Sequence, residues 1–278
     1  MASVDFILNL AALLLWINWR AAQFDPLNKR RPATLIGTLR PAGPTSTRHW
    51  QLPAVIGGLL LLRALFYWQI GSASNPVWAG KLDLSVTVPA FLSSSFGRMF
   101  LFSIFSFGVT LGIFYLWLLL FSILAGPEPL QRLVRMQLGA LDRWPRGVKI
   151  IVPFAATALF WWLASWLFGW LQIDPPPVSA AHRIEQSLVI GLGSYLVWKF
   201  PIGALLALHL LNSYIYFGRH PFWNYVNTTA QTLLTPLQKI PLRAGRVDFA
   251  PVVGTALTFL LAEFAERGLV LLYAKLPL

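Results

Sequence analysis

Ionisable residues inside long apolar stretches are the residues of this chain best suited to chemistry, and four of them are candidates. They are Arg63, Lys199, Glu263 and Glu266. Charged side chains at membrane depth pair with one another, line an ion or proton path, or extend to the membrane surface. Lys199 could pair with Glu263 or Glu266, and such a pair could carry protons or only hold helices together. Both interpretations stay open from the sequence.

His209 also lies inside an apolar stretch, where it could in principle bind haem. A haem held by two histidines needs a second histidine at the same depth, and His49, His182 and His220 all lie in polar loops. A packed or hydrogen-bonded histidine is therefore the expected role.

The chain contains few other signs of cofactor or enzyme chemistry. It has no cysteine, which excludes disulfides, thiolate metal sites and iron–sulfur clusters. No P-loop, HExxH or GxSxG pattern occurs, and Gly191-Leu-Gly193 lacks the strand and the third glycine of a dinucleotide site. We expect no enzymatic activity, no cofactor and no metal.

The elements that must position these residues are membrane-spanning helices. Hydrophobic residues make up 56% of the 278 residues and charged residues 12%, about half the charged fraction of a soluble domain. The apolar stretches are long enough to cross a hydrocarbon core of roughly 30 Å as helices, and they lack the alternation of a membrane β-barrel. The sequence predicts an all-α, polytopic membrane protein. Its six expected spans are residues 4–20, 53–72, 98–125, 149–172, 187–217 and 250–273.

The distribution of charge predicts the orientation of these spans. The net charge is +12, and three loops hold fifteen of the 22 basic residues. Basic loops stay in the cytoplasm, so both termini are expected outside, and the bases are expected to bind anionic lipid headgroups rather than nucleic acid. The first span has an acid and no base before its apolar part, which favours a retained helix over a signal peptide. The three basic loops are residues 20–52, 126–149 and 218–249.

The sequence also repeats itself. A shift of 198 positions aligns residues 34–66 with residues 232–264 and places Pro53 on Pro251, while a middle copy places Pro153 on Pro251. Pro153 and Pro251 are each expected to open a span, because a proline is tolerated in the first turn of a helix. The predicted units are three tandem helical hairpins, at residues 1–75, 76–180 and 181–278.

The basic connectors contain apolar residues at spacings of three and four. This pattern over residues 130–141 and 222–237 predicts short amphipathic helices at the cytoplasmic interface. Pro221 is expected in the first turn of the second one. Asp248 is placed to accept hydrogen bonds from the free N–H groups at the start of the last span.

A further pattern bears on how the helices pack. Gly108 and Gly112 form a GxxxG sequence in the third apolar stretch. Such glycines let a second helix approach closely, either within the same chain or from another one.

Four short motifs mark the third hairpin: Gly218-Arg219-His220-Pro221, Leu234-Thr235-Pro236-Leu237, Ile240-Pro241 and Arg246-Val247-Asp248-Phe249-Ala250-Pro251. With these motifs the hairpin resembles the YggT family, whose members are also called YlmG-like. The resemblance covers about 60 residues and extends weakly to the second hairpin. Ala250 stands where the family pattern has a serine, Thr235-Pro236 lacks the usual acid, and Gln238-Lys239 replaces an arginine pair. Three hairpins would be a variant, since family members have one or two.

The resemblance implies a non-enzymatic role in the bacterial cytoplasmic membrane. Members of the family are linked to the biogenesis of membrane complexes, including haem attachment to a cytochrome b, and to cell or plastid division. It therefore implies a subunit, scaffold or assembly factor whose partners are other integral membrane proteins. The alternative is a small-ion or proton transporter that uses the intramembrane charges. The motif residues are expected to be structural: Pro221, Pro236, Pro241, Asp248 and Pro251.

Overall fold

The structure, a computed structural model, is almost entirely helical in the part of the chain that it describes. It falls into two compact units, and helix α3 contributes residues to both. The prediction of an all-helical protein is confirmed, with one small departure in the described residues, a β ribbon of two-residue strands. The described residues are 2–24, 50–70, 95–124, 134–171, 179–215, 221–237, 242–244 and 247–276.

The first unit consists of three helices that meet in a small apolar core. Ala12, Ile56 and Phe107, one from each helix, form the centre of this core. Because each helix is apolar over most of its length, the few contacts between them leave many large side chains exposed, as expected for surfaces that face lipid. The helices are α1 (Ala2–Phe24), α2 (Gln51–Ile70) and α3 (Phe96–Leu124), the last as far as Gly112.

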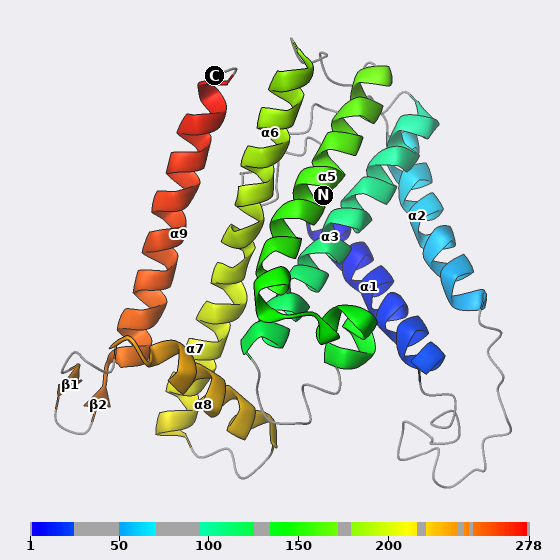
Figure 1. Cartoon of the computed structure of the whole chain (residues 1–278). Coiled ribbons are helices and arrows are strands. Elements are labelled where there is room, and N and C mark those ends of the chain that lie inside the picture. The colour runs from blue at the N-terminus through cyan, green and yellow to red at the C-terminus, as the bar shows by residue number, and fades with distance from the viewer. Residues whose placement is uncertain are drawn as a thin grey trace, which may run out of the picture. The chain divides into compact units, whose positions relative to one another are not determined.

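The second unit contains the remainder of α3 and all later elements. Helix α5 packs along α6, and α7 packs along α9, while α8 lies across the lower ends of α7 and α9 (Figure 1). Strand β1 pairs antiparallel with β2, so that Arg243 faces Asp248. Residues 134–138 are also helical. The other elements are η4 (Gly139–Arg143), α5 (Arg146–Trp170), α6 (Ala180–Gly193), η5 (Ser194–Trp198), α7 (Lys199–Tyr214), α8 (Pro221–Leu234), β1 (Arg243–Ala244), β2 (Val247–Asp248) and α9 (Ala250–Ala274).

Four of the described helical stretches are long and apolar enough to cross a membrane. The predicted first and sixth spans, α1 and α9, are helices as well, but they are not among these four. The membrane character of the chain is therefore supported, while the count of six spans, the orientation and the division into three hairpins stay predictions. The four stretches are Gln51–Gln69, Phe96–Leu124, Arg146–Trp170 and Ala180–Tyr214.

The fifth predicted span is one long helical stretch with a 3-10 interruption, η5, in its middle. Pro201 has no N–H group, so the carbonyl of Val197 lacks its usual helical partner. That carbonyl instead accepts a hydrogen bond from Trp117 Nε1 at 3.2 Å, and Trp198 Nε1 donates to the carbonyl of Leu116 at 3.1 Å. The two indoles thus join α3 to the interrupted helix at the point where its backbone hydrogen bonding is incomplete.

The prolines expected to open helices do so in two of three cases. Pro221 is the first residue of α8, and Pro251 is the second residue of α9. Pro153 instead lies inside α5, which begins at Arg146, so the prediction that Pro153 opens this span is wrong. The helix starts earlier because the preceding turn ends at Pro145, which adopts an extended conformation.

A glycine lies where α5 and α6 pack closely, whereas the two glycines of the GxxxG pattern lie at no such close contact. A Cβ atom on Gly191 would lie 2.9 Å from the carbonyl oxygen of Phe154 and 3.0 Å from the Cβ of Ala158. A Cβ atom on Gly108 or Gly112 would have no described atom within 4 Å. Close helix packing therefore occurs at Gly191, and nothing in the described residues packs against Gly108 or Gly112.

Candidate functional site

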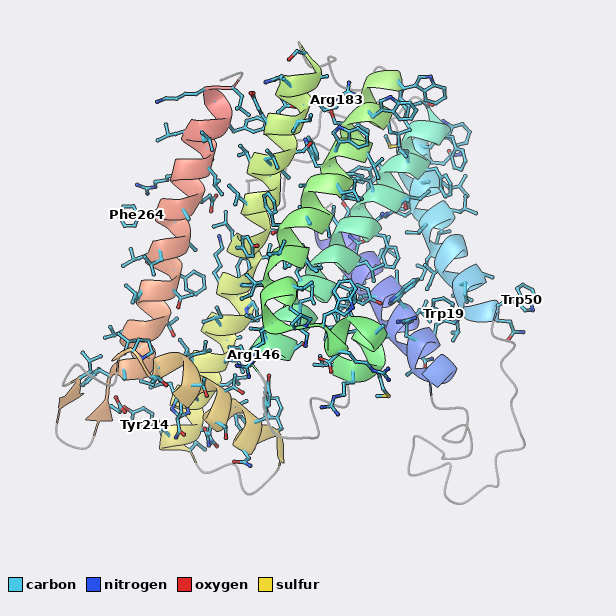
Figure 2. The ribbon with its side chains drawn as sticks, viewed as in Figure 1. Trp19, Trp50, Arg146, Arg183, Tyr214 and Phe264 are labelled. Atoms are coloured by element: carbon cyan, nitrogen blue, oxygen red, sulfur yellow. The ribbon has the colours of Figure 1, made fainter. Side chains whose placement is uncertain are left out.

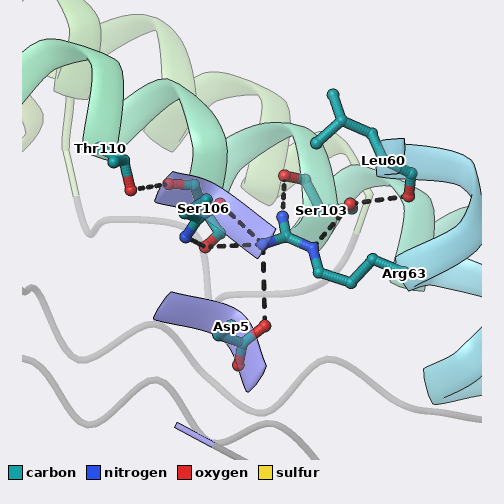
Figure 3. Close-up of polar contacts among 7 residues, drawn as sticks. Asp5, Leu60, Arg63, Ser103, Ser106 and Thr110 are labelled. Atoms are coloured by element: carbon teal, nitrogen blue, oxygen red, sulfur yellow. Dashed lines mark hydrogen bonds and ion pairs between the residues drawn. The ribbon is translucent and has the colours of Figure 1, made fainter. Parts of the chain in front are cut away.

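Arg63 is the centre of a buried polar cluster in the first unit (Figure 3). Its side chain, on α2, is 1% exposed, and two other helices, α1 and α3, supply its partners. Nε donates to Ser103 Oγ at 2.9 Å, and one terminal nitrogen donates to Asn9 Oδ1 at 2.8 Å and to Ser106 Oγ at 3.4 Å. The other terminal nitrogen donates to the carbonyl of Ser103. Asp5 Oδ1 lies 3.7 Å from the guanidinium and supplies the opposite charge.

The partners of Arg63 are themselves fixed. Asn9 donates to Ser106 Oγ at 3.0 Å, and Ser103 Oγ donates to the carbonyl of Leu60 at 2.8 Å. All the donating nitrogens of Arg63 thus point at groups that have a second hydrogen bond or belong to the backbone. This arrangement links α1, α2 and α3, and the guanidinium side chain is 1% exposed among them.

The sequence indicated Arg63 but not its partners. Asp5 and Asn9 are four residues apart, and Ser103 and Ser106 are three apart, so each pair lies on one face of its helix. Such repeated polar positions in an apolar helix are the signal that predicts a buried polar face. They do not by themselves show that the faces of α1 and α3 both turn toward Arg63.

The structure distinguishes between the two glutamates that could pair with Lys199. Lys199 Nζ lies 3.4 Å from Glu266 Oε2, and both side chains are 12% exposed. Lys199 Nζ also lies 5.2 Å from the ring centre of Phe200, at a distance suited to a cation–π contact. Glu263 pairs instead with Arg267 at 3.0 Å, one turn along the same helix, and both of these side chains stay exposed.

A second polar cluster, around Asp142 in η4, was not predicted from the sequence. Ser122 Oγ donates to Asp142 Oδ1 at 2.6 Å, and the buried Lys149 donates to Ser122 Oγ at 2.6 Å. Arg135 Nε donates to Asp142 Oδ2 at 3.2 Å. Burial raises the pKa of the Asp142 carboxyl, but the hydrogen bond from Ser122 and the charges of Lys149 and Arg135 outweigh it, so the pKa lies below its usual value.

The lowered pKa of Asp142 predicts a stability that depends on pH. A carboxyl whose pKa is lower in the folded protein stabilises it above the unfolded pKa of about 4, and this contribution disappears as pH falls through the folded pKa. Asp142→Asn should therefore lower the free energy of unfolding by about 1.5 kcal/mol at pH 7. Thermal unfolding in detergent should show a difference in stability between the variant and the wild-type protein at pH 7, and this difference should be smaller at pH 3. A difference that is the same at both values would contradict the assignment.

His209 is hydrogen-bonded, which is one of the two roles expected for it. Its Nδ1 lies 2.9 Å from Asn227 Oδ1, which links α7 to α8. Within the part of the chain that the structure describes, no group of three or more histidine, cysteine, aspartate or glutamate residues gathers as a metal site would require.

Asp248 binds the first free N–H group of α9. Its Oδ1 accepts a hydrogen bond from the backbone N–H of Ala250 at 2.9 Å. The capping position itself is occupied by Phe249, whose backbone N–H donates to the carbonyl of Leu242 at 3.1 Å. Asp248 thus accepts a hydrogen bond at the start of α9, as expected, but it lies one residue before the N-cap position.

Removing this acceptor should weaken the third hairpin. We expect Asp248→Ala to lower the free energy of unfolding by about 1 kcal/mol, and Asp248→Asn to retain most of it because asparagine keeps an oxygen acceptor. Unfolding with sodium dodecyl sulfate in mixed micelles would measure both. Equal stability of Asp248→Ala and wild type would exclude a capping role.

The remaining motif prolines differ in what the structure says of them. Pro236 lies in the turn after α8 and lines a small apolar cavity of about 230 Å³, whereas Pro241 lies outside the described residues. Thr258 supplies the one polar side chain of this cavity. The other lining residues are Ile202, Leu206, Leu233, Leu234, Leu237, Gly254 and Leu257.

The chain was compared with protein-family models, with curated proteins and with solved structures. None of the three comparisons gave a match.

Proposed function

We propose that this protein is a non-enzymatic subunit, scaffold or assembly factor of a larger membrane complex. The observation that carries the proposal is the closed arrangement around Arg63, where the guanidinium is hydrogen-bonded to fixed groups from two other helices. A carrier site must release and rebind its ligand, whereas this cluster serves to hold helices in place. The resemblance of the third hairpin to the YggT family points in the same direction.

The proposed topology follows from the sequence. Six spans in three hairpins would place the basic connectors in the cytoplasm and both termini outside, in a bacterial cytoplasmic membrane. Helix α8 has an apolar side that packs on α7 and a polar side that would lie among anionic headgroups. The spans would then present their exposed apolar surfaces to lipid and to other integral membrane proteins.

Purification in a mild detergent tests this function. A tagged copy of the chain, expressed at its natural level, should elute with other membrane proteins that mass spectrometry identifies. The matched control is a tagged membrane protein of similar size and an unrelated fold, purified in the same way. If the chain elutes without specific companions, the proposed role in a larger complex is wrong.

A proton or ion transporter is the second candidate, and the pair of Lys199 and Glu266 favours it. The two side chains are each 12% exposed and Lys199 lies directly after η5, and interrupted helices at membrane depth frequently form ion sites. In liposomes, Glu266→Gln should abolish a flux that depends on this pair, while Glu263→Gln should retain it because Glu263 is exposed. Absence of any flux in the wild-type protein would exclude this candidate.

A further inference from the structure

We propose that η5 is a hinge about which α7, α8 and α9 move as one body relative to α5 and α6. The hinge lies within the helical stretch Ala180–Tyr214, near whose ends Figure 2 labels Arg183 and Tyr214. The inference goes beyond the proposed function, since a scaffold and a transporter could both use such a movement. It rests on the backbone of η5, on the two indoles that hold it, and on the contacts that join α7 to α8 and α9.

The backbone of this hinge is weaker than that of a regular α-helix. Helix η5 is five residues long, whereas 3-10 runs of more than three or four residues are uncommon because their hydrogen bonds have poorer geometry. Gly193 and Ser194 stand at its start and Pro201 follows in the first turn of α7, and helices bend at Gly/Ser pairs and at prolines. The hydroxyl of Ser194 is buried without a hydrogen-bond partner among the described residues, so it does not strengthen the segment.

Two indoles hold the hinge in the position that the structure shows. Trp117 of α3 donates to the carbonyl of Val197 at 3.2 Å, and Trp198 of η5 donates to the carbonyl of Leu116 at 3.1 Å. The two bonds are reciprocal, because each indole binds the carbonyl of the residue that precedes the other tryptophan. A side-chain hydrogen bond stabilises a folded protein only modestly. Two such bonds can therefore be released, whereas a continuous backbone ladder would keep the helix in one position.

The contacts beyond the hinge join α7, α8 and α9 into one body. Lys199, the first residue of α7, pairs with Glu266 of α9 at 3.4 Å, and His209 of α7 is hydrogen-bonded to Asn227 of α8 at 2.9 Å. Where α8 meets the end of α3, apolar and aromatic side chains make the contact. Such contacts have no fixed direction and can form again after a shift. Release of the two indoles would therefore let the three helices move together about η5.

Spin labels on pairs of introduced cysteines test the hinge, because the natural chain has no cysteine. Double electron–electron resonance in liposomes measures the distance between the two labels. The test pair joins the two bodies, with Ile151→Cys on α5 and Leu211→Cys on α7. One control pair lies within α5 and α6, Leu163→Cys with Leu188→Cys, and the other lies within α7 and α9, Leu211→Cys with Leu260→Cys. All five side chains are exposed, so the labels displace no buried neighbour.

Removal of the two indole donors should release the hinge. In the wild-type background each pair should give one main distance. Trp117→Phe with Trp198→Phe keeps an aromatic ring at both positions but removes both N–H donors. In the test pair, the ratio of a second distance to the main one should then rise about 30-fold, and about fivefold for either substitution alone. Both control pairs should keep their distance. Trp166→Phe, which removes a 61% exposed indole, should leave all three pairs unchanged.

Two results would overturn the hinge. The first is a test pair whose distances are the same in the double variant, in both single variants and in the wild-type protein. The second is a new distance in either control pair, because the indoles would then hold the whole unit together rather than one joint. Neither result would affect the proposed scaffold function, which depends on the proteins that co-purify with the chain.

Discussion

Arg63→Leu should lower the free energy of unfolding by about 3–5 kcal/mol, the largest effect that we expect from one substitution. The change removes the cation that pairs with Asp5, and it leaves Asn9 Oδ1 and Ser103 Oγ without their charged donor. Polar groups left without partners in an apolar interior account for most of the expected loss. Unfolding of the purified protein in mixed micelles, followed by circular dichroism, would measure it.

Two controls define the origin of this effect. Arg63→Lys keeps the charge but loses the planar fork that reaches both Asn9 and Ser103, so it should give an intermediate loss. Leu62→Ala, on the neighbouring and 60% exposed side chain, should change stability by only about 0.5 kcal/mol. If Arg63→Leu unfolds like the wild-type protein, the cluster does not clamp the helices of the first unit.

Gly191→Leu should lower the free energy of unfolding by about 3 kcal/mol, because α5 leaves no space for a side chain at this position. Even the first carbon of the new side chain would lie 2.9 Å from the carbonyl oxygen of Phe154. A backbone atom inside a helix cannot move aside without moving the whole helix, so α5 and α6 must separate. The same unfolding measurement applies, and Gly191→Ala should show part of the loss.

Gly169 is the matched control for this substitution. It lies in α5, and a Cβ atom there would have no described neighbour within 4 Å. Gly169→Ala should therefore leave stability unchanged or raise it by up to about 1 kcal/mol, since alanine favours helix more than glycine. Equal losses at positions 169 and 191 would show that the effect comes from helix propensity and not from packing.

Much of the secondary structure could be predicted from the sequence because lipid restricts the choices. A long apolar stretch can satisfy its backbone hydrogen bonds in a membrane only as a helix, so length and composition predict α2, α3 and α5 within a few residues. The prediction for Pro153 was wrong because α5 begins at Arg146, and a proline is also tolerated inside a membrane helix.

Local contacts were also predictable. Asp248 and Ala250 are two residues apart, and the hydrogen bond between them follows from the chemistry of a helix start. The positions of the other histidines predicted that His209 would be packed or hydrogen-bonded. They did not predict its partner, Asn227.

The sequence by itself determined that the chain is helical and apolar enough for a membrane, and it indicated which charged residues lie within the helices. The tertiary structure alone decided what those charges contact. Asn9 and Ser106 are 97 residues apart and Lys199 and Glu266 are 67 apart, and their contacts depend on how each helix is rotated about its axis. Helical periodicity fixes which residues share a face, but packing against neighbouring helices decides where that face turns. For this reason Glu266 became the buried partner of Lys199, while Glu263, less than one turn away, stayed exposed.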